Sequence, residues 1–225
     1  MELMLDTANL QEIEKGLAIY PISGVTSNPS IIKAEGGVEF FAHMHKIREL
    51  IGEERSLHVQ VIAQDTQGIL AEAEKILDKL GSTTYIKIPV TEAGLQAIRI
   101  LSERGVNVTA TAIYTTLQGM LAMLSGARYL AVYYNRMLNI DIDAAKVIKE
   151  LSSLLWANSG NCQVLAASFK NISEITTAYA NGASCCTVPY SLLATGLAMP
   201  SITKAVHDFS ANWEEVYGKR TLLDL

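Results

Sequence analysis

One lysine stands in a short hydrophobic segment where a charged side chain is unexpected. The segment 83–91 reads TTYIKIPVT, and Lys87 is its only charged residue. An ammonium group loses its hydration in a buried strand, so lysine is rare there. Two interpretations are open: the side chain reaches solvent along the strand, or the amine is kept dry so that it can react. A buried amine has a lowered pKa, and neutral lysine attacks a carbonyl to give an iminium.

An iminium is an electron sink for making or breaking a carbon–carbon bond, and this reaction also needs proton shuttles and groups that bind hydroxyls. Polar side chains suited to these tasks recur near the ends of successive hydrophobic segments, namely Asp6, Thr26, Gln60, Thr111, Tyr133 and Ser168. Asn28 and Arg136 follow shortly after two of these segments, in TSNPS and YNRM. Spacing in the sequence does not bring these groups together, so a fold must do so.

Short segments typical of strands alternate along the chain with longer segments typical of helices. The strand-like segments are 3–6, 24–26, 58–62, 85–89, 106–111, 129–134, 163–168 and 184–188. Hydrophobic residues at spacings of three and four predict helices over 66–80, 92–103 and 141–155. This alternation indicates parallel strands with helices outside, and eight such units predict an α/β fold of the (β/α)8 TIM barrel type. A doubly wound open sheet is the competing fold.

The alternation of side chains along a strand predicts which residues face the barrel interior. In the segment 85–89, Ile86 and Ile88 form the hydrophobic face expected under the helices. Tyr85 and Lys87 are then directed inward. In a (β/α)8 barrel, polar residues at the carboxyl ends of the strands build the active site.

The same reasoning applies to the other strand-like segments. It places Asp6 on the face opposite its hydrophobic neighbours, and it directs Gln60 and Tyr133 inward. In the segment 163–168 we place Ser168 inward together with Ala166. These polar groups are therefore expected at one end of the barrel.

Each of these side chains also has a purely structural interpretation. Asp6 can cap the first helix, since DTANLQEIE is a plausible helix start. Thr26 and Asn28 can serve only the turn before a proline in TSNPS. Tyr133 can be a core tyrosine whose hydroxyl is satisfied, and Arg136 can be a solvated charge at a helix start.

Composition limits the classes of partner. The 225 residues are 49% hydrophobic and 18% charged, as expected for a globular protein with a sizeable core, and we expect one domain over 1–225. The net charge of −5 argues against nucleic acid or an anionic membrane as the main partner, although a small anionic substrate needs only a few local cations. The N-terminus has acidic residues where a signal peptide is basic, so we expect a cytoplasmic protein.

The cysteines and histidines offer no alternative chemistry. Three cysteines, two of them the adjacent Cys185 and Cys186, do not form a disulfide framework and are expected to be small core residues. His43 and His45 do not have metal-ligand spacing, so neither a metal nor another cofactor is expected. A final amphipathic helix is predicted over about 201–218, and it either docks on its own barrel or covers a neighbouring subunit.

The motifs LDTAN, GVTSNPSII, VQVIA, YIKIPVT, TATAIYTTLQ, YYNR and VLAASFK resemble, in this order, those of the small transaldolase family that includes the fructose-6-phosphate aldolases. The resemblance covers essentially the whole chain. It implies a (β/α)8 barrel, a Schiff-base mechanism with Lys87 as the covalent residue, and a homo-oligomer, which is a decamer in well-known members. The partner it implies is a small sugar phosphate.

The resemblance also implies roles for the other residues. Asp6 assists proton transfer, while Thr26 and Asn28 bind substrate hydroxyls. Thr111 and Tyr133 position a catalytic water or act as acid and base. The phosphate of the aldehyde partner is bound by Arg136, Ser168 and Lys170.

Two positions bear on which reaction is expected. Transaldolases of this family typically carry Glu where the chain has Gln60 and Phe where it has Tyr133, so both residues are of the aldolase type. We therefore expect reversible cleavage of fructose 6-phosphate to dihydroxyacetone and glyceraldehyde 3-phosphate. A transaldolase, which passes the three-carbon unit to another aldehyde, is the first alternative. A barrel that binds sugar phosphates without catalysis is the second, since a fold does not guarantee a function.

Overall fold

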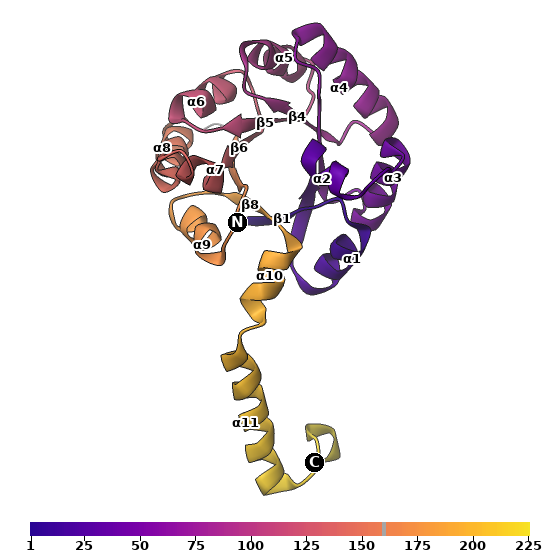
Figure 1. Cartoon of the computed structure of the whole chain (residues 1–225), viewed down its shortest axis with the longest axis vertical. Coiled ribbons are helices and arrows are strands. Elements are labelled where there is room, and N and C mark those ends of the chain that lie inside the picture. The colour runs from indigo at the N-terminus through magenta and orange to yellow at the C-terminus, as the bar shows by residue number, and fades with distance from the viewer. Residues whose placement is uncertain (159–160) are drawn as a thin grey trace. The chain divides into compact units, whose positions relative to one another are not determined.

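Eight parallel strands close into a barrel in the order β1 to β8 (Figure 1). The structure is a computed structural model and describes residues 1–158 and 161–225. The strands are β1 Glu2–Asp6, β2 Ile22–Thr26, β3 Ser56–Gln60, β4 Tyr85–Pro89, β5 Val108–Ile113, β6 Tyr129–Tyr133, β7 Gln163–Ala167 and β8 Cys185–Val188. Pairing of β1 with β8, beginning at Glu2 and Cys185, completes the closure. The (β/α)8 prediction is confirmed, and the open doubly wound sheet is excluded.

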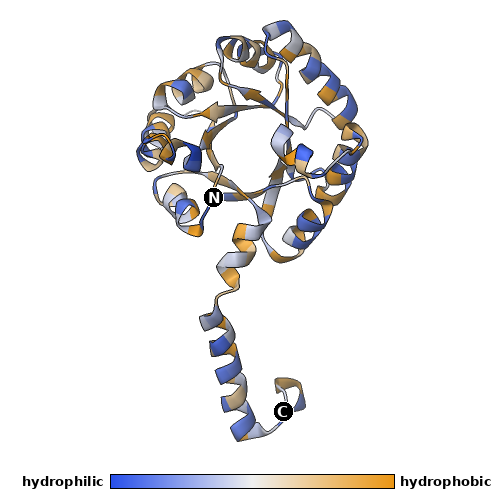
Figure 2. Cartoon of the chain, in the orientation of Figure 1, coloured by the Kyte–Doolittle hydropathy of each residue, from blue (hydrophilic) through white to orange (hydrophobic). Residues whose placement is uncertain are grey.

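Helices surround the barrel and mix hydrophobic with hydrophilic residues along their length (Figure 2). They are α1 Leu10–Ile19, α2 Pro29–Ala34, α3 Phe40–Ile51, α4 Thr66–Leu80, α5 Glu92–Glu103, α6 Thr116–Leu124, α7 Tyr134–Leu138, α8 Ala144–Ala157 and α9 Ile172–Ala180. The hydrophobic periodicity of α4 explains its position, because Ile69, Ala73 and Ile76 lie on one face and are buried. The predicted bounds of α4 and α5 agree with the structure.

The barrel interior contains a hydrophobic cluster of Met4, Tyr129, Ala131, Leu165 and Cys185. Leu165 therefore faces inward, and its neighbour Ala166 faces the helices. The prediction that Ala166 points inward was wrong, while the inward direction of Ser168 stays a prediction. The strand β7 ends at Ala167, and Ser168 has a φ of 65°, so strand alternation does not extend to it.

A polar group is buried within the interior below the carboxyl ends of the strands. The His58 imidazole is fully buried, with its Nδ1 atom 2.8 Å from Thr109 Oγ1 and its Nε2 atom 2.9 Å from Ser56 Oγ. The ring stacks on Tyr85 at a centroid distance of 4.6 Å. Burial, and then the charge of Lys87, lower the His58 pKa from 6.5 to about 3, so the imidazole is neutral at physiological pH.

The chain divides into two compact units, Met1–Tyr190 and Ser191–Leu225. The helix α10, Tyr190–Leu197, leads into the second unit, which contains α11, Pro200–Tyr217, and a 3-10 turn, Leu222–Asp224. Within this unit Trp213 packs on Tyr217 at a ring distance of 4.5 Å. The helix predicted over about 201–218 is thus present as α11. Among the described residues, no helix combines the length and hydrophobicity needed to cross a membrane.

Candidate active site

Lys87 lies inside the barrel near the carboxyl end of β4. Its register partners are Gln60 on β3 and Thr109 on β5, and only 2% of its surface is exposed. The Nζ atom donates a hydrogen bond to the backbone carbonyl oxygen of Ser27 at 3.2 Å. The interpretation of Lys87 as a surface lysine is therefore wrong, and its amine is held away from bulk solvent.

The start of α5 packs closely against the end of the lysine strand at Gly94. Thr91 caps α5 by accepting a hydrogen bond from the Gly94 amide. A Cβ atom at Gly94 would lie 2.0 Å from the Pro89 carbonyl oxygen, so only glycine permits this approach of helix to strand. The close packing fixes where β4 ends relative to Lys87.

Asp6 ends β1 and is joined to the neighbouring strands by hydroxyl groups. The Thr26 hydroxyl donates to Asp6 Oδ1 at 2.7 Å, and Thr187 on β8 therefore donates its own hydroxyl to Thr26 at 2.6 Å. Asp6 does not cap the first helix, because Asn9 accepts the hydrogen bonds of the first turn of α1. Thr187 was missed from the sequence, since nothing in SCCTV connects it with a residue 161 positions away.

Charges from one strand and from two connections between strands and helices act on the Asp6 carboxyl group. Burial raises the Asp6 pKa above 3.8, while the positive charges of Lys87, Arg136 and Lys170 act in the opposite direction. The three cations therefore lie close enough to influence one carboxyl group. The fold thus brings together residues that are far apart in the sequence.

Asn28 follows β2 at the barrel mouth. Its Oδ1 atom accepts hydrogen bonds from the amides of Ser30 and Ile31 and caps α2. The structural interpretation of Asn28 as a turn residue is therefore correct for its side-chain oxygen, which is used in the turn. Its amide nitrogen still carries donors suited to a substrate hydroxyl.

Thr111 and Tyr133 form a hydroxyl pair across β5 and β6. The Thr111 hydroxyl donates to the Tyr133 hydroxyl oxygen at 3.0 Å, and both residues are buried. The Arg136 guanidinium lies over the Tyr133 ring, 4.7 Å from its centroid, and the Tyr114 ring meets it edge-on at 5.7 Å. The tyrosine is thus held at its ring and at its hydroxyl, so its proton can be presented in one direction.

The connections after β6 and β7 carry the predicted phosphate ligands. Arg136 lies in α7, directly after β6, while Ser168 and Lys170 follow β7. The Asn135 amide donates to the Ser168 carbonyl oxygen at 3.2 Å, which holds the two connections together. Two cations and a hydroxyl are suitable ligands for a phosphate dianion.

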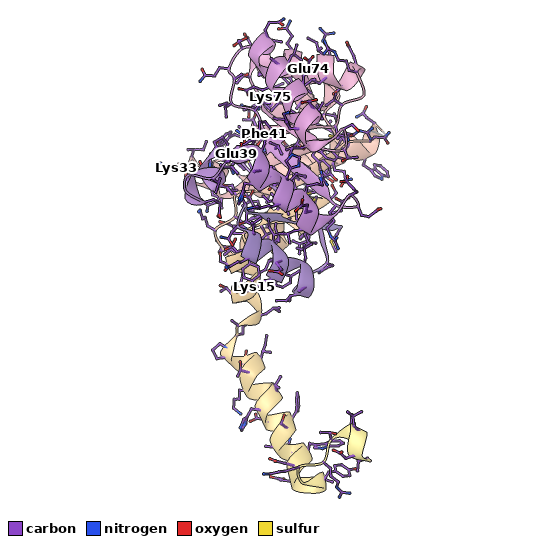
Figure 3. The ribbon with its side chains drawn as sticks, turned by 90° about the vertical axis from the view of Figure 1, so that its right-hand side faces the viewer. Lys15, Lys33, Glu39, Phe41, Glu74 and Lys75 are labelled. Atoms are coloured by element: carbon purple, nitrogen blue, oxygen red, sulfur yellow. The ribbon has the colours of Figure 1, made fainter. Side chains whose placement is uncertain are left out.

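Gln60 lies at the end of β3 beside a cavity of about 510 Å³. Among the described residues, its buried Oε1 atom has no hydrogen-bond partner, so it can accept from a water or a substrate hydroxyl. The cavity also borders Asn28, and Lys75 stands over the Phe41 ring, 5.8 Å from its centroid, at its wall (Figure 3). This cavity is beside the lysine site and mostly hydrophobic.

The remaining reactive side chains offer no second centre in the part of the chain that is described. Cys185 and Cys186 are fully buried, as predicted, and burial raises the pKa of the Cys186 thiol to about 12. A thiol in this state is a poor nucleophile. Within residues 1–158 and 161–225, no three His, Cys, Asp or Glu side chains are grouped so that they could hold a metal ion.

Fold and site together define a (β/α)8 barrel protein with a buried lysine at the carboxyl ends of its strands. The family model described as Transaldolase/Fructose-6-phosphate aldolase matches residues 3–221. The chain belongs to this family. It is 49% identical over 222 residues to a protein of Streptococcus pneumoniae (strain ATCC 700669 / Spain 23F-1) named "Probable fructose-6-phosphate aldolase", and the match covers 99% of this chain and 100% of that protein. The resemblance inferred from the motifs is thus confirmed.

Proposed function

We propose that the protein is a class I aldolase that reversibly cleaves fructose 6-phosphate to dihydroxyacetone and glyceraldehyde 3-phosphate. The observation that carries this proposal is the dry amine of Lys87, which is 2% exposed and lies among hydroxyl, carboxyl and cationic groups. The family of the chain and the name of its pneumococcal relative support the same reaction.

In the proposed mechanism Lys87 Nζ attacks the C2 carbonyl of the ketose, and loss of water gives an iminium. Removal of the C4 hydroxyl proton breaks the C3–C4 bond, and the electron pair moves into the iminium to form an enamine. Glyceraldehyde 3-phosphate leaves as the aldehyde. Protonation of the enamine at C3 and hydrolysis of the new iminium then release dihydroxyacetone and restore the amine.

The proton transfers are assigned to the groups that face this lysine. Tyr133, oriented by Thr111, handles the proton of the bond-breaking step and holds the hydrolytic water. Asp6 has a raised pKa, which suits it to exchange a proton closer to neutrality than an exposed aspartate does. Among the described residues, the Gln60 Oε1 atom has no hydrogen-bond partner. We assign it the role of accepting a hydrogen bond from water or substrate.

Binding is assigned to two sides of the barrel mouth. Thr26 and Asn28 bind the hydroxyls of the dihydroxyacetone portion from the β2 side. Arg136, Ser168 and Lys170 bind the phosphate from the β6 and β7 side. A substrate held at both sides has its C3–C4 bond placed next to Lys87.

The family contains both aldolases and transaldolases, and Gln60 and Tyr133 favour the aldolase. A tyrosine hydroxyl allows a water to be held for release of free dihydroxyacetone, whereas a transaldolase must keep the enamine until an acceptor arrives. Fructose 6-phosphate alone separates the two reactions. We expect glyceraldehyde 3-phosphate to be released continuously without an added acceptor, and release only in the presence of an acceptor would identify a transaldolase. A barrel that only binds sugar phosphates would show release under neither condition.

We propose in addition that the chain forms a homo-oligomer in which α11 packs on a neighbouring subunit, with a decamer as the state that the family resemblance suggests. Support comes from the hydrophobic side chains of α11 that are exposed in the single chain, namely Ile202, Val206, Phe209 and Val216. We also propose a cytoplasmic location, because Cys162, Cys185 and Cys186 are free thiols among the described residues, as is usual in a reducing compartment.

A further inference from the structure

Glu174 is a buried carboxylate that has no role in the chemistry described above. It lies in the first turn of α9 and is 5% exposed. Among the described residues it has no cation within ion-pair distance, and it is satisfied by two neutral N–H donors. Its Oε1 atom accepts from Asn135 Nδ2 at 2.8 Å, and its Oε2 atom accepts from the Lys170 backbone amide at 2.7 Å.

The two donors belong to the two connections that carry the proposed phosphate ligands. Asn135 directly precedes Arg136 in α7, and the backbone N–H of Asn135 donates to the Ser168 carbonyl oxygen. Lys170 is itself one of the proposed ligands. One carboxylate therefore joins the segment after β6 to the segment after β7.

A local role as a helix cap does not account for this arrangement. The N-cap of α9 is Asn171, whose side chain accepts from the Glu174 amide. Capping would use one carboxylate oxygen within the first turn. The other oxygen reaches Asn135, which is 39 positions away in the chain.

We propose that Glu174 is a positioning residue for phosphate recognition, fixing Arg136 and Lys170 relative to each other through Asn135 and the Lys170 amide. The inference rests on the proposed function, because it concerns the same phosphate ligands. A phosphate dianion is bound well only when its cations are held in a suitable geometry, and residues behind the ligands supply that geometry.

The replacement Glu174→Gln tests the inference, because both groups around the carboxylate are donors. A glutamine side chain at this position has only one acceptor oxygen. Its NH2 group therefore faces one of the two donors, the Asn135 side chain or the Lys170 backbone amide, and that donor loses its acceptor. The double variant Asn135→Asp/Glu174→Gln restores an acceptor at both contacts. It also keeps the same net charge as the wild type.

Kinetics are measured in the synthesis direction with dihydroxyacetone and two acceptors, glyceraldehyde 3-phosphate and glyceraldehyde. We expect Glu174→Gln to raise KM for the phosphorylated acceptor about tenfold, the effect of losing one such hydrogen bond, with kcat unchanged. KM for glyceraldehyde is expected to stay at the wild-type value. In the double variant, KM for glyceraldehyde 3-phosphate is expected to return to the wild-type value. Electrostatics alone predicts the opposite sign, because removing a negative charge near two cations strengthens phosphate binding.

Glu72 provides a matched control. Its carboxylate likewise accepts two N–H groups after a strand, here the backbone amides of Ile62 and Ala63 on its Oε2 atom, but on the β3 side of the barrel. Glu72→Gln is expected to leave the ratio of kcat/KM for the two acceptors unchanged. This ratio is independent of the fraction of protein that is folded, so a partly unfolded variant still gives a result.

Three outcomes overturn the inference. The ratio is unchanged in Glu174→Gln, or it changes equally in Glu72→Gln, or the double variant fails to recover it. Arg136→Ala, measured in parallel, separates this failure from that of the proposed function. If Arg136→Ala leaves the ratio unchanged, the phosphate assignment itself is wrong; if it lowers the ratio while Glu174→Gln does not, only the positioning role is wrong.

Discussion

Lys87 Nζ donates a hydrogen bond to the backbone carbonyl oxygen of Ser27 over 3.2 Å. The contact connects β4 with the segment after β2, so it fixes the lysine without using a charged partner. An iminium formed at this nitrogen keeps one proton, and the same carbonyl oxygen can still accept it. A backbone dipole is thus aimed at the position where positive charge develops in the proposed reaction.

The hydroxyl pair of Thr111 and Tyr133 makes the first prediction. If the Tyr133 hydroxyl transfers the proton, Tyr133→Phe lowers kcat for fructose 6-phosphate cleavage by about 10²- to 10⁴-fold. Thr111→Val removes only the donor to that hydroxyl at 3.0 Å and lowers kcat about tenfold. Tyr114→Phe is the matched control, since its ring contacts Tyr133 and its hydroxyl is assigned no step. Wild-type kcat in Tyr133→Phe would remove tyrosine from the mechanism.

The raised pKa of Asp6 predicts that this residue lowers the stability of the protein at neutral pH. A carboxyl group whose pKa is higher in the folded than in the unfolded state favours folding at low pH, and this contribution is lost as pH rises above 3.8 through the folded pKa. Asp6→Asn therefore loses activity but raises the melting temperature at pH 7 to 8, by on the order of a few degrees. Thermal unfolding between about pH 4 and about pH 8 measures the difference in melting temperature between wild type and Asp6→Asn. A variant that is less stable than wild type across the range would show that Asp6 stabilises the barrel.

His58 predicts the opposite pH dependence of stability. Its pKa is about 3 in the folded protein against 6.5 as the ordinary value, so the unfolded chain binds the proton more tightly. Stability is lost as pH falls from 6.5 towards 3, by on the order of several kcal/mol over the whole window. His58→Gln keeps a donor and an acceptor for Thr109 and Ser56 and is expected to flatten this slope in urea unfolding. His45→Asn, at an exposed position in α3, is the control; equal slopes for wild type and His58→Gln would contradict the prediction.

The hydrophobic residues of α11 predict an effect on assembly. A chain that ends after Pro200 lacks this helix, so its oligomer mass in light scattering should fall below that of the full chain. Val206→Ser/Phe209→Ser should weaken the same assembly, because the two exposed side chains lose hydrophobic area. Lys204→Ser/Asp208→Ser, which removes an exposed ion pair of the same helix, is the control. Unchanged mass in the truncated chain would exclude α11 from the interface.

Much of the barrel could be predicted from the sequence because local patterns are strong in its central elements. The segment 85–89 alternates hydrophobic residues with Tyr85 and Lys87, and the structure gives it the same bounds as β4. The helices predicted from the spacing of three and four agree at both ends with α4 and α5, whereas the one predicted over 141–155 is α8, Ala144–Ala157. The burial of Lys87 followed from the hydrophobic residues on either side of it.

Other features depend on contacts that no local pattern contains. In DTANLQEIE the sequence offered Asp6 as the cap, but β1 extends to Asp6 and the side chain of Asn9 accepts the first-turn hydrogen bonds instead. The left-handed conformation of Ser168 is unusual for serine, so the end of β7 was placed one residue late. Thr187 and Glu174 each act on residues in distant parts of the chain, and a polar side chain alone does not reveal such a partner.

The central claim is that the Lys87 amine forms a Schiff base with the ketose, and borohydride trapping tests it most directly. The protein is incubated with fructose 6-phosphate, reduced with borohydride, digested and analysed by mass spectrometry, with Lys87→Ala and the surface variant Lys75→Ala in parallel. We predict that wild type and Lys75→Ala gain one dihydroxyacetone unit, less water and plus two hydrogens, on the peptide that contains Lys87. Lys87→Ala should gain no mass and should not cleave fructose 6-phosphate. An unmodified Lys87 in active wild-type protein, or cleavage by Lys87→Ala at the wild-type rate, would contradict the account.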